Sequence, residues 1–265
     1  MLRARAGRFH ALRAMAFALV CLAIPVPESW AQAPRSAAEL HRSGEYEAAM
    51  NAGSTAGDGE SLTNAALAGV AWASMRDAPC RDCLKRVEDI ARRAMDADNG
   101  NPRAYVALVM VIAFESRLVG TRASSRAHYP EQAKAALDAA LKFAPNDSWA
   151  LAALGGLHIE VVRSAGRVVA GFLYDAHFDT GVAYFKRALA AEPGDPVVQL
   201  NYALSLSSYA FNNQCGEIET ALAAAARATP RDAYAAAMKM RAQQLLDLLR
   251  ADKRVEYLEI GRAHV

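Results

Sequence analysis

Residues 137–145 read Leu-Asp-Ala-Ala-Leu-Lys-Phe-Ala-Pro. Three other stretches follow the same order of small, large and turn-forming residues: 91–99, 185–193 and 222–230. Each has the composition of the end of an Ala-rich amphipathic helix, followed by a turn residue and the start of a new helix. Because self-similarity at a fixed scale is the mark of repeat architectures, the repeated unit decides the fold.

The repeated positions fall on one face of a helix. They lie five, eight and twelve residues before the last residue of each stretch, and most of them are small. They are Ala94, Ala91 and Val87; Ala140, Leu137 and Ala133; Ala188, Phe185 and Gly181; and Ala225, Leu222 and Ile218. Spacings of three and four residues place such positions on one stripe. A stripe of small residues lets a neighbouring helix approach closely, so we expect successive units to pack on one another.

This pattern resembles the second helix of a tetratricopeptide repeat (TPR), which closes with a proline as Pro145, Pro193 and Pro230 do here. Asn99 departs from that rule. Leu151, Leu154 and Gly155 resemble the first helix of the family. Residues 44–49 resemble the turn and second-helix start of an earlier unit, whose closing position is expected at Ser61.

The resemblance covers most of residues 36–250. It implies an all-α fold, a TPR-like α-solenoid of about five helix-turn-helix units in a domain of residues 32–258. It also implies a concave face that binds a protein or a peptide. The family period is about 34 residues, and the two central units are each longer by about a dozen. Because the stripes keep their register, we expect the additions between the helices, on one edge of the solenoid.

The two central insertions resemble each other. Residues 115–129 and 160–178 both contain Glu, Arg, Gly and Arg, followed by Ala-His and an aromatic residue. Guanidinium groups bind carboxylates and phosphates bidentately, so neighbouring Arg/His clusters predict a clamp for an acidic group. The candidate binding residues are Arg117, Arg122, His128, Arg163, Arg167 and His177.

A structural interpretation of the insertions stands beside the functional one. Tyr129 and Phe178 match the aromatic residue that opens a second helix, and the histidines before them are then helix-entry or capping residues. The arginines are then solvated or paired with Glu115 and Glu160. The aliphatic run 168–174 either packs back on the repeats or forms an apolar patch for a partner. No metal-ligand spacing accompanies the histidines, so we predict no metal site.

Cys80 and Cys83 follow Pro79 and are expected in the first turn of a helix. Three outcomes are open: a structural disulfide, which we favour outside the cytosol, a zinc site, or a thiol-exchange pair. The βαβ context of redox pairs is missing, so we do not expect a thiol oxidoreductase. Cys215 lies three units later and is expected to be a free or intermolecular thiol.

Both ends of the chain contain segments that we do not expect in the mature protein. Four arginines precede the apolar run 14–24, which is typical of a signal peptide, residues 1–31. We favour cleavage after Ala31 over cleavage after Ala33, because Pro34 would follow the second site. Cys21 is a poor lipidation site because Val20 precedes it. Residues 259–265 resemble a translated sequencing adapter, so we expect them to be an artefact.

Charge and motifs narrow the function further. Residues 1–31 hold four of the 30 Lys and Arg residues and one of the 28 Asp and Glu residues, so the remainder is close to neutral. Composition therefore favours neither a nucleic acid nor a membrane surface as partner, and no membrane span is expected. The sequence contains no nucleophile elbow, phosphate-binding loop or paired carboxylates. We therefore predict neither an enzyme nor a cofactor. We expect a periplasmic or secreted scaffold for a protein or peptide, or else a small-molecule-binding accessory of a transport system.

Overall fold

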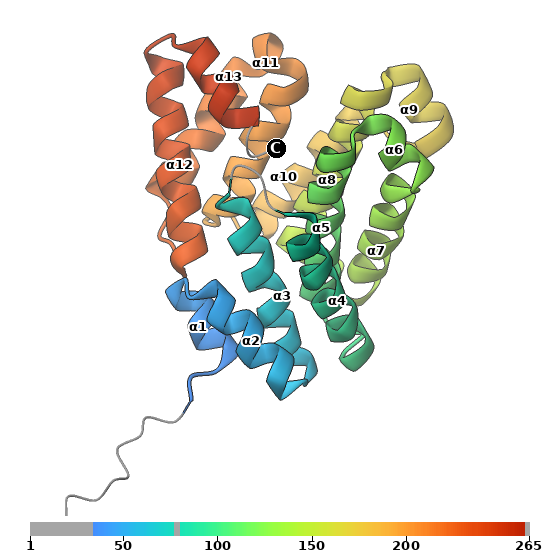
Figure 1. Ribbon diagram of the computed structural model, residues 1–265. Helices are drawn as coiled ribbons and strands as arrows, with labels where there is room; N and C mark the ends of the chain where they lie inside the picture. The colour runs from blue at the N-terminus through green and yellow to red at the C-terminus, as the bar shows by residue number, and fades with distance from the viewer. Residues whose placement is uncertain (1–33, 77–79, 263–265) are drawn as a thin grey trace, which may run out of the picture. The chain divides into compact units, whose positions relative to one another are not determined.

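The computed structural model describes residues 34–76 and 80–262, which form α-helices and no strand (Figure 1). The predicted signal peptide, both candidate cleavage sites and residues 263–265 lie outside the described residues. The helices are α1 (Ala37–Ser43), α2 (Tyr46–Ala56), α3 (Gly59–Ser74), α4 (Arg81–Ala97), α5 (Pro102–Val119), α6 (Thr121–Arg126), α7 (Tyr129–Phe143), α8 (Ser148–Ala165), α9 (Arg167–Tyr174), α10 (Phe178–Ala191), α11 (Pro196–Arg227), α12 (Ala233–Arg250) and α13 (Arg254–Arg262). The prediction of an all-α fold is confirmed.

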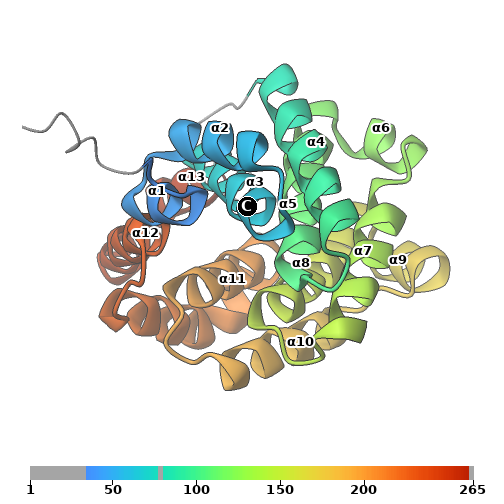
Figure 2. The same cartoon turned by 90° about the horizontal axis from the view of Figure 1, so that it is seen from below.

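The helices pack as successive antiparallel hairpins. Helix α3 packs on α4, α5 on α7, and α8 on α10, while α11 packs on α12. The first helices of neighbouring hairpins also contact each other, α3 with α5, α5 with α8 and α8 with α11 (Figure 2). The short helices α6 and α9 are interposed within the second and third of these hairpins, where the sequence predicted the insertions.

The predicted stripes are the contact faces of α4, α7, α10 and the second half of α11. All twelve stripe residues are buried, and eight of them have no exposed surface at all. The closest approach joins α8 to α10. A Cβ atom on Gly155 would lie 2.7 Å from the carbonyl oxygen of Gly181, and one on Gly181 would lie 2.8 Å from that of Gly155. The repeat therefore depends on small residues where two helices touch.

An Asn or Asp residue caps the N-terminus of each of the helices α3, α5, α8, α11 and α12. In each case the side chain accepts a hydrogen bond from a backbone N–H of the first turn, which satisfies a donor that the helix itself leaves unpaired. These caps are Asp58, Asn101, Asp147, Asp195 and Asp232. The last four follow the closing residues of the repeat by two positions, so they belong to the repeated unit.

The capping ends of three hairpins are joined by a polar network around Trp149. The guanidinium groups of Arg103 and Arg231 both lie over its ring, with their central carbons 4.6 and 5.5 Å from the ring centroid. Its Nε1–H donates to the buried carboxylate of Asp195 at 2.7 Å, which also accepts from Arg231 at 2.8 Å. A buried carboxylate with these donors is well compensated, so the network ties the units together.

Two details differ from the sequence prediction. Ser61 does not close a unit: α2 ends at Ala56, and Ser61 lies in the first turn of α3 behind its cap Asp58. The last stripe belongs to one 32-residue helix, α11, which kinks at Ala210 (φ −131°, ψ 33°) instead of breaking into two helices. The kink serves as the inter-helix turn of that unit.

The first and last hairpins touch. Helix α1 contacts α12, and the hydroxyl of Tyr234 in α12 lies 3.4 Å from Ser74 Oγ in α3. Ala71 of α3 belongs to one buried apolar cluster with Leu151 of α8 and Tyr234. Apolar side chains of α3, α8 and α12 therefore belong to one cluster. No helix of the described residues is long and apolar enough to cross a membrane.

Candidate functional site

The two insertions have the same local geometry. Gly120 and Gly166 end α5 and α8 with nearly identical dihedrals, φ 79° and ψ 164° or 155°. Only glycine adopts this region readily, so each glycine fixes the direction in which its insertion leaves. Helices α6 and α9 follow at once and lie at the same end of the hairpins (Figure 1). Ser125 Oγ and Tyr174 Oη are 3.1 Å apart, which joins the insertions directly.

The structure does not gather the predicted Arg/His set into one clamp. Among the described residues no hydrogen bond or ion pair joins any two of its members. Arg163 binds Glu160 through two hydrogen bonds of 2.7 and 2.6 Å, which is the pairing that the structural interpretation anticipated. The guanidinium of Arg117 lies 4.7 Å from the ring centroid of Phe114, and Arg122 and Arg167 are exposed.

The two histidines stand at helix entries. His128 immediately precedes α7 and His177 immediately precedes α10, and neither side chain caps its helix. His128 Nδ1 lies 3.5 Å from Glu131, and His177 Nε2 lies 3.4 Å from Asp175. The aromatic residues that follow them pack inward: Tyr129 contacts the core, and the ring of Phe178 is 5.2 Å from that of Tyr209.

A groove of about 420 Å³ lies between α7, α8 and α9. It is open to solvent, and apolar atoms make most of its surface. Its floor comes from α7 and α8, and α9 with the residues after it forms one wall. The lining residues are Pro130, Glu131, Lys134, Ala135, Asp138, Leu157, His158, Val161, Phe172, Leu173, Tyr174, Asp175 and Ala176. An inserted segment therefore completes the cavity.

His158 is the one buried ionisable side chain in the groove wall. Its Nδ1 accepts the backbone N–H of His177 at 3.2 Å, and its ring stacks on Tyr184 at 5.6 Å. Burial lowers the pKa of His158, the positive charge of Lys134 lowers it further, and Asp175 opposes both. The neutral imidazole with its proton on Nε2 is therefore favoured, so His158 adds no charge to the groove.

Carboxylates dominate the charge of the groove. Glu131, Asp138 and Asp175 face a single ammonium group, that of Lys134, which binds Asp138 at 2.8 Å. This pairing raises the pKa of Lys134, which therefore stays charged. An apolar groove with an acidic rim is suited to a partner that carries basic and apolar groups together. That preference is opposite to the acidic ligand predicted from the arginines.

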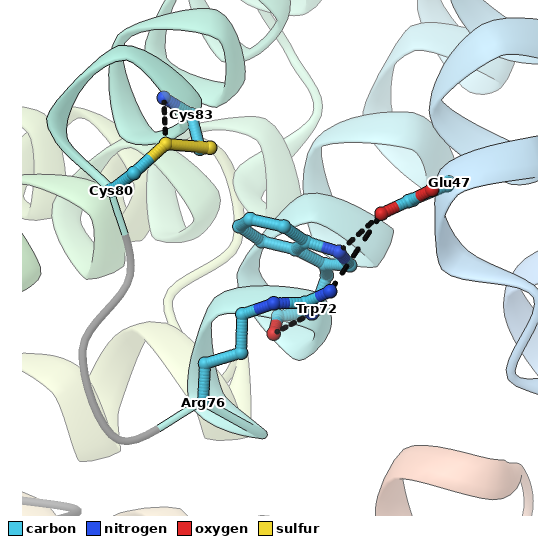
Figure 3. Close-up of a disulfide and its surroundings, with 5 residues drawn as sticks. All are labelled: Glu47, Trp72, Arg76, Cys80 and Cys83. Carbon is cyan, nitrogen blue, oxygen red and sulfur yellow. Dashed lines mark hydrogen bonds and ion pairs between the residues drawn. A yellow bond between two sulfur atoms is a disulfide. The ribbon is translucent and has the colours of Figure 1, made fainter.

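Cys80 and Cys83 form a disulfide at the start of α4, with Cα atoms 5.2 Å apart (Figure 3). Cys80 is the capping residue, and its sulfur accepts the N–H of Cys83 at 3.1 Å. Arg76, just after the end of α3, lies 3.6 Å from the ring centroid of Trp72 on that helix, whose Nε1–H donates to Glu47 at 2.9 Å (Figure 3). Cys215 is a free, exposed thiol.

Sequence reasoning missed the groove residues of α7 and α8. A single signal was present: His158 interrupts the apolar run of α8, and a titratable residue inside an apolar helix is a candidate for function. Lys134 and Asp138 carried none, because an i, i+4 ion pair on a helix is ordinary surface chemistry. No protein-family model matches this chain, and no curated protein matches it either.

Proposed function

We propose that this protein is an exported, TPR-like scaffold that binds a segment of another protein in the groove between α7, α8 and α9. The groove is the observation that carries the proposal. It lies at the edge of the repeats where an insertion adds a wall, and its lining is apolar with carboxylates at the rim. The signal-peptide pattern of residues 1–31 supports export, to the periplasm or the medium.

The repeat organisation supports a TPR-like scaffold. The stripes are buried, the hairpins follow one another, and both enlarged units carry their additions at one end. Because the groove lies at the edge that carries the insertions, we place the partner site at this edge. The charge of the groove favours a partner segment with Lys or Arg beside apolar side chains.

Selection of peptides from a random library tests this proposal. The chain beginning at Gln32 is the bait, since all described helices fall in the compact unit from Arg35 onward. We expect enriched peptides to combine basic and apolar residues. Ala135 is exposed, and in Ala135→Trp the new ring fills the groove. Because the peptide then loses the contact of one buried side chain, its binding weakens at least about tenfold.

Gln132→Trp is the matched control, because Gln132 is exposed on the same helix and lies outside the groove. It is expected to leave peptide binding unchanged. A library that yields no enriched peptide contradicts the proposal. So does equal binding by the two tryptophan variants.

The volume of the groove favours a second candidate, a small-molecule-binding accessory of a transport system. Ligand pockets commonly occupy about 300–1,000 Å³, and the groove, at about 420 Å³, falls within that range. Native mass spectrometry of protein purified without denaturation distinguishes the two functions. A bound small molecule that Ala135→Trp displaces supports the carrier, whereas ligand-free protein that still binds selected peptides supports the scaffold.

A further inference from the structure

Exposed apolar side chains concentrate at the edge formed by α6, α9 and the ends of α5 and α8 that precede them. Eight large apolar side chains are exposed among the described residues, and five of them lie here: Leu118, Val168, Val169, Phe172 and Leu173. Val168 is 83% exposed and Phe172 is 87% exposed. They stand four residues apart on α9 and share one face of that helix.

Helix α9 is amphipathic with its larger apolar side chains turned outward. Its buried residue is Ala170, which has no exposed surface and packs with Val161 and Val162 of α8. A small residue therefore attaches the helix to the protein, while its valines, phenylalanine and leucine face solvent. This arrangement exposes apolar area without any gain in core packing, which marks an interaction surface.

The same edge is strongly basic. Residues 116–127 and 161–174 contain Arg117, Arg122, Arg126, Arg163 and Arg167, and the acidic residues next to them are Glu115, Glu160 and Asp175. Glu160 neutralises Arg163, and the other four guanidinium groups form no ion pair among the described residues. The near-neutral composition of the whole chain hides this local excess of arginine, which favours an anionic partner.

We propose that this edge docks on the surface of a membrane that contains anionic phospholipids. Phosphate groups pair with the arginines, while Val168 and Phe172 insert among the upper acyl carbons. A lipid surface is favoured over an acidic protein because Val168 and Phe172, each exposed by more than four fifths, lie beside arginines that form no ion pair, and a bilayer presents acyl chains and phosphate groups together. A fluid bilayer accommodates protruding side chains, whereas a protein partner needs a matching pocket for each.

Val168 and the arginines lie outside the groove, whereas Phe172 and Leu173 also line it, so the edge and the groove share part of α9. A scaffold held at a membrane in this way attaches peripherally. Docking at this edge places the groove beside the lipid headgroups, because α9 is shared between the edge and the groove wall. Partner segments next to a membrane would then be the ones within reach.

Vesicle co-sedimentation tests the proposal with the chain beginning at Gln32. We expect binding to vesicles of phosphatidylcholine with about a third phosphatidylglycerol, weaker binding at high salt, and none to phosphatidylcholine alone. Arg122→Ala with Arg167→Ala weakens binding about 25-fold, at about fivefold per arginine near an anionic surface. Val168→Ser with Phe172→Ser weakens it at least about tenfold.

The matched control carries Arg42→Ala and Met240→Ser, which alter an exposed arginine and an exposed apolar residue on α1 and α12. It is expected to bind like the unaltered chain. Failure of the unaltered chain to bind anionic vesicles overturns the proposal, and so does equal binding by edge and control variants. Capture of an acidic protein by the edge without vesicle binding also overturns it.

A gain of signal gives a second readout. In a Phe172→Trp variant, the indole fluorescence shifts to shorter wavelength relative to the unaltered chain when anionic vesicles are added, because the ring leaves water. Val255→Trp, at a position that is also exposed but lies on α13, shows no such added shift. Identical spectra for Phe172→Trp with and without vesicles contradict the proposal.

Discussion

Phe185 and Phe172 are thirteen positions apart and have opposite environments. Phe185 is 1% exposed in the stripe of α10, and Phe172 is 87% exposed on α9. The repeat explains the first, since its position relative to Pro193 places it against the neighbouring hairpin. Nothing in the packing explains the second. Residues of the stripes are therefore held by the fold, and those of the α9 edge are free to serve an interaction.

Replacing Phe185 or Phe172 by alanine tests this comparison with the largest expected change in the free energy of unfolding. Phe185→Ala removes a fully buried ring and leaves a cavity, so the free energy of unfolding falls by about 3–5 kcal/mol. Phe172→Ala changes it by less than about 0.5 kcal/mol, because the ring gains little from folding. Urea denaturation followed by circular dichroism measures both. A loss above 1.5 kcal/mol for Phe172→Ala, a threshold about three times the expected limit, would falsify the assignment of α9 to the surface.

Two adjacent glycines sharpen the comparison within one helix. A Cβ on Gly155 meets the backbone of Gly181 at 2.7 Å, whereas one on Gly156 meets nothing closer than 3.8 Å. Gly155→Ala is expected to cost about 2–3 kcal/mol, because backbone atoms must move apart. Gly156→Ala is expected to gain about 0.5–1 kcal/mol from helix propensity. Thermal unfolding of both variants checks the signs, and destabilisation by both would show that the helices are not tightly apposed at Gly155.

The stripes and the insertions were predictable because each recurs. A small residue five positions before four closing residues is improbable without a common packing role, and two similar insertions in adjacent units had to fall at corresponding places. The capping residues also recur in the sequence, since Asn101, Asp147, Asp195 and Asp232 each follow a closing residue by two positions, but they were not among the predictions. The closing position of the first unit was predicted wrongly because the match covered only residues 44–49, without a stripe to fix where the second helix ends.

The candidate site was less predictable because it depends on contacts between distant residues. The arginines were found by their spacing, but spacing does not show that Arg163 pairs with Glu160 or that the rest stay apart. The groove brings together Asp138 of α7 and Asp175 after α9, which are 37 positions apart in the sequence. The contact between Tyr234 and Ser74 joins residues 160 positions apart and had no counterpart in local pattern. The basic edge was also not predicted, because the near-neutral composition of the whole chain gave no indication of a local excess of arginine.

The disulfide gives a third test, of smaller effect. It closes a loop of only four residues, for which loop-closure entropy supplies about 2 kcal/mol. Replacing both Cys80 and Cys83 by serine should lower the free energy of unfolding by about that amount and leave peptide selection unchanged. Cys215→Ser is the control and should be neutral, since that thiol is exposed and free.

A redox role for the pair makes a different prediction. In a thiol oxidoreductase the serine variants would lose disulfide-exchange activity toward a reduced test protein, whereas a structural disulfide has none to lose. Measurable exchange by the unaltered chain that disappears in the double variant would therefore contradict a structural assignment. It would leave the comparison of stripe and edge intact, because Cys80 begins α4 and lies on neither.

The smallest effect is the response of stability to pH. Burial lowers the pKa of His158 in the groove wall and of His41 in α1, so the folded chain resists protons that the unfolded chain accepts. Since the unfolded state then binds more protons, stability is fully present above the ordinary histidine pKa of about 6.5 and falls as the pH drops below it. The loss continues down to the lowered folded-state pKa values.

His158→Gln measures how much of this pH dependence comes from His158 in the groove wall. Glutamine does not titrate in this range, and its amide oxygen can still accept a hydrogen bond from the N–H of His177. Unfolding measured from pH 7.5 to pH 5 should show a shallower decline for this variant than for the unaltered chain. An unchanged slope would place the whole response on His41 and other groups.

Protonation of His158 also adds a positive charge to a groove that is suited to a basic partner. Peptide affinity should therefore weaken over the same pH range in the unaltered chain and less in His158→Gln, which ties the electrostatics of the wall to what the groove binds.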